Sequence, residues 1–214
     1  MSPAHTPPPG RIGRLRLEHR LAVARRGADL LERKLRILRA RHERLVEEAD
    51  SAEAQWRERS REAESWLLRA VFVGGEHPLL AVGAGIAPAE LALPWTSTLG
   101  VRHPDRTVRV GFPRPQAEVF RPSAALVRAE AAYRAALRAA AAYAAARTAA
   151  RLVGDEVRAT RGRIRALRRH WIPRLERELS VALAGLEQAA HEEAVQRRWA
   201  ARATGVRPGN GGHH

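Results

Sequence analysis

Apolar residues near the N-terminus of the chain recur at alternating steps of four and three residues. This alternation is the 3.5-residue period of a coiled-coil seam. Such a seam cannot be buried within its own helix, so it predicts a partner helix, most economically from the same chain. The positions are Leu17, Leu21, Ala24, Ala28, Leu31, Leu35, Leu38, His42, Leu45, Ala49, Ala52 and Trp56.

A first long helix is predicted over residues 11–70, a stretch without proline whose internal glycines are Gly13 and Gly27. His42 and Arg59 are polar interruptions of the seam, and such residues more often fix the register of pairing than bind a ligand. Beyond the positions above, the pattern continues at Arg59, Ala63, Trp66, Ala70 and Val73.

A second long helix is predicted over residues 123–203, with Ser123 as its N-cap after Pro122. Its first part carries an apolar stripe at Leu126, Tyr133, Leu137 and Ala140. Two such helices predict an antiparallel hairpin with both chain ends at the same tip. The longer second helix should overhang near the segment that joins the two.

The second helix also carries a four-and-three series, and this series changes phase. Two successive steps of four, from Trp171 to Leu175 to Leu179, shift the pattern locally. Pro173 lies in the same place and is expected to kink the helix. The positions are Val153, Val157, Thr160, Ile164, Leu167, Trp171, Leu175, Leu179, Ala182, Leu186 and Ala189.

The segment between the helices, residues 71–122, has a different composition. It holds seven prolines and six glycines, a density that helices do not tolerate. Residues 106–112 alternate and are rich in β-branched side chains, which predicts one strand of a β-hairpin after a turn at residues 103–105. The partner strand could be residues 79–82 or 96–101. The fold class is therefore mainly all-α, a long antiparallel two-helix coiled coil with a short β-hairpin insert.

The ends of the chain predict no folded structure. Residues 1–10 are rich in proline and residues 204–214 in glycine, and we expect a disordered arm and tail. The arm lacks the apolar core of a signal peptide, and no apolar run approaches the ~20 residues that span a bilayer. A cytoplasmic protein is the default expectation, and the absence of cysteine excludes disulfides and thiolate metal sites.

The chain carries a formal net charge of +15, and all but one of its 38 basic residues are arginine. Such charge favours polyanions or acidic protein surfaces. Eight arginines fall in residues 158–177, which could dock on an acidic surface or simply form a solvated helical face. We find no phosphate-binding loop, metal-ligand spacing or nucleophile turn. We therefore expect neither enzymatic activity nor a cofactor.

Two segments resemble the D subunit of the V-type and A/V-type rotary ATPases, the central rotor stalk. Residues 20–38 are similar to that family's opening at Gly27, Asp29, Leu30, Leu31 and Lys34, the single lysine of the chain. Residues 156–187 are similar to its second helix at Thr160-Arg161, Ala166-Leu167, Ile172-Pro173 and Leu186-Glu187. Gly162, Arg165 and Arg168 depart from the family, which has arginine, asparagine and glutamate there.

The resemblance implies a shaft that transmits torque and does not itself handle ATP. Its two ends would insert into a hexamer of catalytic A and regulatory B subunits. The insert would lie toward the membrane, near the small F subunit and the connector on the membrane ring. Localisation at the cell membrane would come through this complex. Glycines 27 and 162 would allow close approach of helices or partners. The arginines implied to contact the hexamer are Arg11, Arg14, Arg16, Arg20, Arg25, Arg26, Arg197, Arg198 and Arg202.

Two other functions remain open from the residues alone. A basic coiled coil could bind nucleic acid, or the chain could be a scaffold without an enzyme partner. The insert separates them from the shaft, because a nucleic-acid-binding coiled coil has little need of a proline-rich β-hairpin at its far end.

Overall fold

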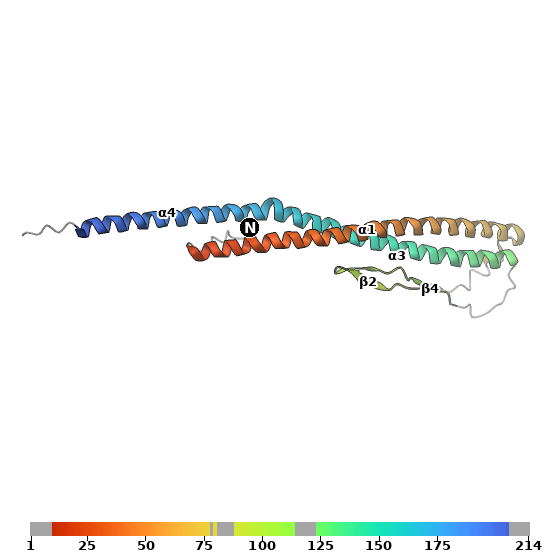
Figure 1. Ribbon diagram of the computed structural model, residues 1–214. Coiled ribbons are helices and arrows are strands. Elements are labelled where there is room, and N and C mark those ends of the chain that lie inside the picture. The colour runs from red at the N-terminus through yellow and green to blue at the C-terminus, as the bar shows by residue number, and fades with distance from the viewer. Residues whose placement is uncertain (1–9, 78, 81–87, 114–122, 206–214) are drawn as a thin grey trace, which may run out of the picture. The chain divides into compact units, whose positions relative to one another are not determined.

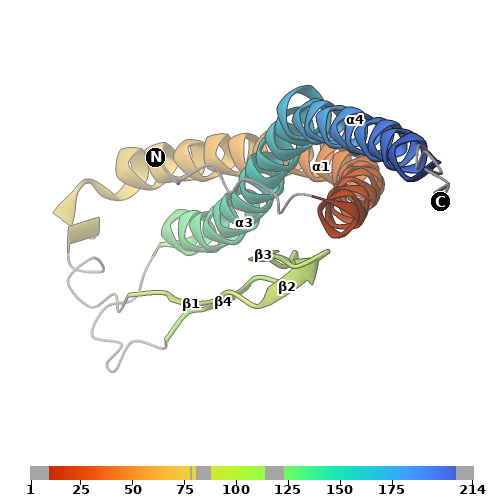
Figure 2. The same cartoon turned by 90° about the vertical axis from the view of Figure 1, so that its left-hand side faces the viewer.

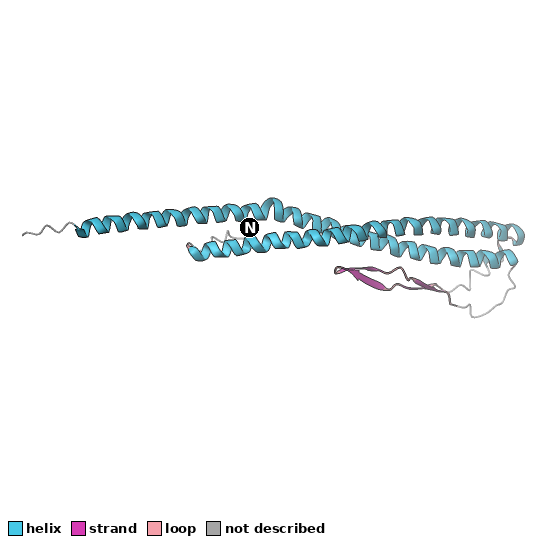
Figure 3. Cartoon of the chain, in the orientation of Figure 1, coloured by secondary structure: helices cyan, strands magenta, loops and turns pink. Residues whose placement is uncertain are grey.

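The computed structural model describes residues 10–77, 79–80, 88–113 and 123–205, with side chains as far as residue 202. Long helices and a small β-hairpin make up these residues, so the all-α fold class with a hairpin insert is confirmed (Figures 1 and 3). The segments 1–9 and 206–214, expected to be disordered, lie outside the described residues. The chain divides into two compact units. The terminal unit combines residues 1–32 with 162–214, and the central unit is residues 33–161.

Helix α1 runs from Arg11 to Gly74, four residues beyond the end expected from the sequence. Alanine, leucine, arginine and glutamate dominate it, and these residues have high helix propensity. Its C-terminal end has a local cause. Gly75 takes a φ of 73°, and its N–H donates to the carbonyl of Val71 at 2.8 Å. This is a left-handed helix cap, which glycine adopts without the steric cost that a Cβ imposes.

The seam predicted along α1 is the face that the helix buries. Leu31, His42, Ala52 and Trp56 are half-buried, and every other member of the series from residue 17 to residue 56 is buried. Leu38 is completely buried, whereas its neighbour Ile37 is 54% exposed. The period therefore identifies the buried face without help from the partner helix.

In the central unit, α1 pairs antiparallel with helix α3, which runs from Ala124 to Ala166. Lys34 contacts Glu156, Trp56 stacks on Tyr143 with ring centroids 5.5 Å apart, and Ala63 packs near Ala132, so partner numbers fall as α1 numbers rise. The predicted N-cap is confirmed, because the N–H of Leu126 donates to the Ser123 hydroxyl at 3.3 Å.

The apolar stripe predicted at the start of α3 is wrong in two of its members. Tyr133 is 38% exposed and Leu137 is 48% exposed, whereas the preceding alanines, Ala132 and Ala136, are buried. A step of one residue turns a helical position by about 100°. The helix turns its alanines inward because they pack beside Ala63 and the large ring of Trp66. Likewise, Arg59 and Val73 on α1 are exposed.

Close approach of the helices occurs at a glycine that the sequence did not single out. A Cβ on Gly154 would lie 2.7 Å from Nε2 of His42, so the histidine ring occupies the space that a side chain would need. Among the described residues, a Cβ built on Gly27 or Gly162 would have no atom of another segment within 4 Å. Close approach of a second helix at these two positions is therefore wrong.

In the terminal unit, the first part of α1 packs against helix α4, Ile172–Gly205. Leu17, Leu21, Ala24 and Leu175 form its buried cluster, with Ile172, Leu179 and Ala182 around it. Helix α4 continues past the start of α1 (Figure 1). From residue 187 to residue 202 only Ala194 and Val195 are half-buried, and the others are exposed. The overhang in this unit is thus at the C-terminal end of α4, and not near the insert as expected.

Helices α3 and α4 are joined by η1, a π-helical turn at Leu167–Trp171. The N–H of Ile172 donates to the carbonyl of Leu167, five residues earlier, so this turn holds one residue more than an α-helical turn. That extra residue absorbs the phase shift between Trp171 and Leu175. The irregularity precedes the kink expected at Pro173, which lies in the first turn of α4, where a missing N–H is tolerated.

The described part of the insert is one β-hairpin on one side of the helices of the central unit (Figures 1 and 2). Strand β1 (Glu90–Ala92) pairs with β4 (Arg109–Gly111), and β2 (Trp95–Thr98) pairs with β3 (Val101–Pro104), both antiparallel. Leu99 and Gly100 form the two-residue turn with φ of 49° and 86°. Positive φ at both positions is typical of the hairpin turn whose twist matches that of the strands.

The hairpin corrects two expectations from the sequence. The turn expected at residues 103–105 is wrong, because His103 and Pro104 belong to β3. Both candidate partner strands are also wrong, because residues 109–111 pair with residues 90–92. Residues 96–101 contain the hairpin turn itself, and residues 81–82 of the other candidate lie outside the described part. The turn has leucine where the usual Asn-Gly pair has asparagine, so the sequence lacks the signal by which such a turn is recognised.

Replacing Leu38 with Ala should lower the free energy of unfolding by about 2–5 kcal/mol, because it leaves a cavity in the seam. Replacing the neighbouring Ile37, which is mostly exposed, should cost about 0.5 kcal/mol or less. Chemical denaturation followed by circular dichroism measures both. Equal losses would mean that the seam is not buried.

Replacing Gly154 with Ala should cost about 1–3 kcal/mol, because the new methyl group must displace the ring of His42. The same change at Gly162 meets open space and should gain about 0.5–1 kcal/mol through helix propensity. A double variant, Gly154→Ala with His42→Ala, should recover part of the loss. No recovery in thermal denaturation would show that the ring is not the cause.

Candidate functional site

The arginines implied to contact a partner do not form one cluster. Arg14 pairs with Glu18 at 3.5 Å and Arg197 with Glu193 at 2.9 Å, each within its own helix. Arg25 crosses to Glu176 on α4 at 2.7 Å. Residue 197 lies 21 positions beyond residue 176, about 30 Å along a helix at 1.5 Å per residue. Arg25 therefore lies about 30 Å behind Arg197 along α4, and Arg14, eleven residues earlier on the antiparallel α1, lies about 15 Å behind it.

Some of these arginines are used inside the terminal unit and some are not. The guanidinium of Arg20 lies 5.8 Å from the centre of the Trp171 ring. Arg26, Arg198 and Arg202 are exposed, and none of them has an ion pair within the described part of the chain. These three have charges that are available to a partner.

Arg168 makes the densest set of ion pairs between helices of the terminal unit. Its Nη2 lies 3.3 Å from Asp29 and its Nε lies 2.8 Å from Glu32, so one arginine of η1 holds two carboxylates of α1. The sequence singled out Arg168 only as a departure from a family pattern. Its role could not be read from the sequence, because the contact depends on where the π-helical turn places it.

A second apolar surface lies on α1 in the terminal unit. Ile12 is 64% exposed, and Val23 and Leu30 are each 56% exposed. Their separations of eleven and seven residues are close to whole numbers of 3.6-residue turns, so they share one side of the helix, opposite the seam. Arg26 borders this side. An apolar surface edged by a free cation is suited to contact with another protein.

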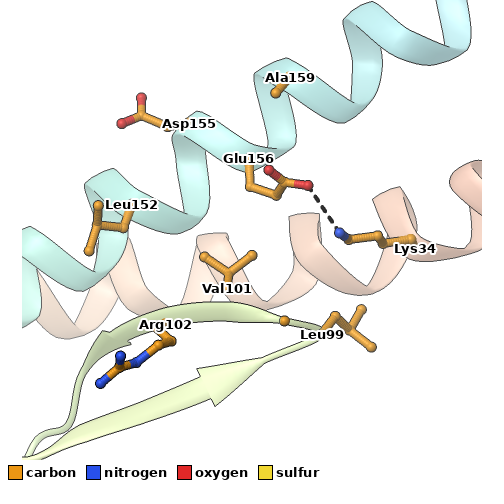
Figure 4. Close-up of a pocket in the computed structure, with 9 residues that line it drawn as sticks. Lys34, Leu99, Val101, Arg102, Leu152, Asp155, Glu156 and Ala159 are labelled. Carbon is orange, nitrogen blue, oxygen red and sulfur yellow. Dashed lines mark hydrogen bonds and ion pairs between the residues drawn. The ribbon is translucent and has the colours of Figure 1, made fainter.

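The central unit has a cavity of about 420 Å³ under the tip of the hairpin (Figure 4). Nζ of Lys34 lies 3.0 Å from Oε1 of Glu156, and the buried Thr160 donates to the same oxygen at 3.2 Å. Leu99 and Val101 of the hairpin complete the rim. The charge of the only lysine is thus already matched by a carboxylate of the partner helix.

The end of α1 in the central unit presents large apolar side chains to solvent. Phe72 is 93% exposed, Val73 is 72% exposed and Leu68 is 71% exposed, and Leu80 beyond the helix is 70% exposed. Exposed apolar groups at this density are typical of surfaces that contact another protein. The sequence placed Val73 in the seam, so this surface was missed.

Residues that could hold a metal ion do not gather anywhere in the described ranges. Among the described helices, none has the length and apolarity needed to cross a bilayer.

A family model that describes the D subunit of ATP synthase matches residues 14–202, which is most of the chain. The chain therefore belongs to the ATP synthase D subunit family and is a stalk subunit of a rotary ATPase complex. A search of curated proteins found no match. The matched range includes both helical stretches and the hairpin.

Deleting one residue in the π-helical turn tests how the turn sets the register. Removal of the exposed His170 should convert the turn to α-helix and leave the seam positions from Leu175 onward in phase with those before Leu167. We expect stability within about 1 kcal/mol of wild type.

Deletion of the exposed Arg151 is the matched control. It moves Val153, Val157 and Ile164 off the seam and should cost about 3 kcal/mol or more. Denaturation followed by circular dichroism compares the two. Equal damage from both deletions would contradict the assignment of an extra residue to the turn.

Proposed function

We propose that this member of the ATP synthase D subunit family is the central rotor shaft of a V/A-type rotary ATPase. It transmits torque between a hexamer that binds and hydrolyses ATP and the ring that moves ions through the membrane. The shaft itself carries no catalytic residue and takes no cofactor. Each angle of the shaft favours a different nucleotide state of the surrounding subunits, which couples the sites mechanically.

The observation that carries this proposal is the buried seam that joins two helices in each unit. Twisting or bending a helix pair requires its members to slide past each other. Sliding would withdraw side chains such as Leu38 and Leu175 from the contacts that bury them. Ion pairs between helices, at Lys34–Glu156 and Arg168–Glu32, oppose the same movement. A pair fastened in this way resists torque better than a single helix.

The terminal unit supplies the surface for the hexamer of A and B subunits. Arg26, Arg198 and Arg202 have free charges, and exposed ion pairs that they form with a partner would each be weak. Weak, solvated contacts suit a surface that must leave one subunit and meet the next. The apolar side at Ile12, Val23 and Leu30 adds contact area without fixing one orientation through directional bonds.

The central unit supplies the contacts with subunits that rotate together with the shaft, and these contacts can be permanent. The apolar surface at Leu68, Phe72 and Val73 suits the connector that joins the shaft to the membrane ring. The hairpin and the helices beside it suit the small F subunit of the stalk. The complex places the chain at the cytoplasmic side of the cell membrane without a span of its own, and nucleic acid is not a partner.

Co-purification with the hexamer and the F subunit tests this function. Replacing Arg26, Arg198 and Arg202 together with Gln should weaken retention by the hexamer about tenfold or more at low salt, because three steering charges are lost. Helicity should not change.

A triple variant of Arg44, Arg128 and Arg151 is the control, because these are also exposed arginines without an ion pair among the described residues. It removes the same charge and should be retained like wild type. A bead attached to a single introduced cysteine should rotate when ATP is added. A chain that ignores the hexamer and instead shifts duplex DNA with a steep salt dependence would contradict the proposal.

A further inference from the structure

The hairpin with Phe112, here called the β-arm (residues 90–112), rests on the helices of the central unit through a few polar contacts. Nη1 of Arg106 lies 3.5 Å from Oε1 of Glu48. The ring of Phe112 lies near two guanidinium groups of α3, with its centroid 5.4 Å from Cζ of Arg134 and 5.0 Å from Cζ of Arg138. At the tip, Leu99 and Val101 border the cavity and do not fill it (Figure 4).

Two of the helix residues that hold the arm, Glu48 and Arg134, also have ion-pair partners within the helices. Glu48 forms an ion pair with Arg41 at 3.8 Å, and Arg134 forms one with Glu130 at 2.5 Å. Under the tip of the hairpin, Lys34 and Glu156 form an ion pair with each other. Removing the arm would therefore leave none of these charges without an opposite charge nearby.

Polar groups of the β-arm also find their partners within the arm. His103 is 1% exposed, yet both of its ring nitrogens have partners within the arm. Nε2 lies 3.0 Å from the Thr98 hydroxyl, and Nδ1 lies 3.0 Å from the carbonyl of Pro104. Asp105 donates its N–H to the carbonyl of Pro94 at 2.8 Å, and Arg102 lies over the ring of Trp95 at 5.8 Å.

Glu48, which pairs with the arm, also has one buried oxygen. Its Oε2 is buried without a hydrogen-bond partner. Arg106 of the arm lies against the other oxygen of this carboxylate, Oε1. A buried acceptor without a partner destabilises the state that contains it.

We propose that the β-arm is a releasable element, which undocks from α1 and α3 as a unit while the helix pair stays folded. Most polar contacts of both surfaces remain after separation, so the docked form is held by the burial of His103 and Pro104 and by three cationic contacts, those of Arg106, Arg134 and Arg138. In the released form the arm exposes the face that carries Val101 and His103. This inference stands independently of the proposed function.

Native-state hydrogen exchange on the full chain, read by mass spectrometry, tests release. Amides of β2 and β3 should exchange at least about 100-fold faster than those of residues 35–45 on α1, at low urea and with little urea dependence. Replacing Arg106 with Gln should accelerate exchange in the arm about threefold to tenfold and leave the helices unchanged. High salt should act in the same direction, because it screens the Arg106–Glu48 pair.

Arg109→Gln is the matched control, since Arg109 lies on β4 and has no ion pair among the described residues. Arg106→Gln and Arg109→Gln with equal effects would overturn the proposal. So would arm amides that exchange only as fast as the helices, because the arm would then leave only on global unfolding.

A disulfide provides a second, independent readout, because the chain has no cysteine of its own. Val101→Cys with Leu152→Cys places one thiol on each side of the cavity rim. Oxidation should slow exchange in β2 and β3 at least about tenfold, and a reductant should reverse it. Cross-linking without slower exchange in β2 and β3 would contradict release.

Discussion

The structure depends on the burial of one apolar seam along helix α1. A helix of 64 residues has no core of its own, so its leucines are removed from water only if another helix covers them continuously. α3 does this in the central unit and α4 in the terminal unit. In each unit, the packing of the two helices depends on which small and large side chains the partner helix places opposite that seam.

The extra residue of η1 keeps that match along the C-terminal helix. If the same residues formed a continuous α-helix without the π-helical turn, the stretch after Trp171 would turn Arg174 and Glu178 toward the seam instead of Leu175 and Leu179. The π-helical turn lies beside Pro173, which has no N–H to donate to the helix. Because one backbone hydrogen bond is already missing there, the turn disrupts the helix little further. Arg168 then reaches Asp29 and Glu32 from within the turn, which ties the irregular turn to α1.

The charged residues on the surface fall into two groups, those that pair with an opposite charge in the chain and those that do not. Arg25 and Lys34 have carboxylate partners on the facing helix, and they stabilise the pairing of helices. Arg26, Arg198 and Arg202 have none in the described residues, and they are the ones suited to an outside partner. The same distinction sets the β-arm apart, because its polar groups and those beneath it are matched separately. An element that shares few obligatory contacts with its support can leave it at low cost.

Local spacing and propensity were enough to predict the two long helices, the buried face of α1, the N-cap at Ser123 and the place of the phase shift. The family was indicated by the resemblance of two segments to known sequences. Other features needed the packed molecule. Ala132 and Ala136 face inward, in place of Tyr133 and Leu137, because the bulk of Trp66 on the facing helix leaves room for small side chains alone. His42 meets Gly154, Arg168 reaches two carboxylates, and β1 pairs with β4, and each of these contacts joins residues far apart in the chain. Their positions depend on the register between elements, and a one-residue change in register, such as the extra residue of η1, turns every later side chain by about 100°.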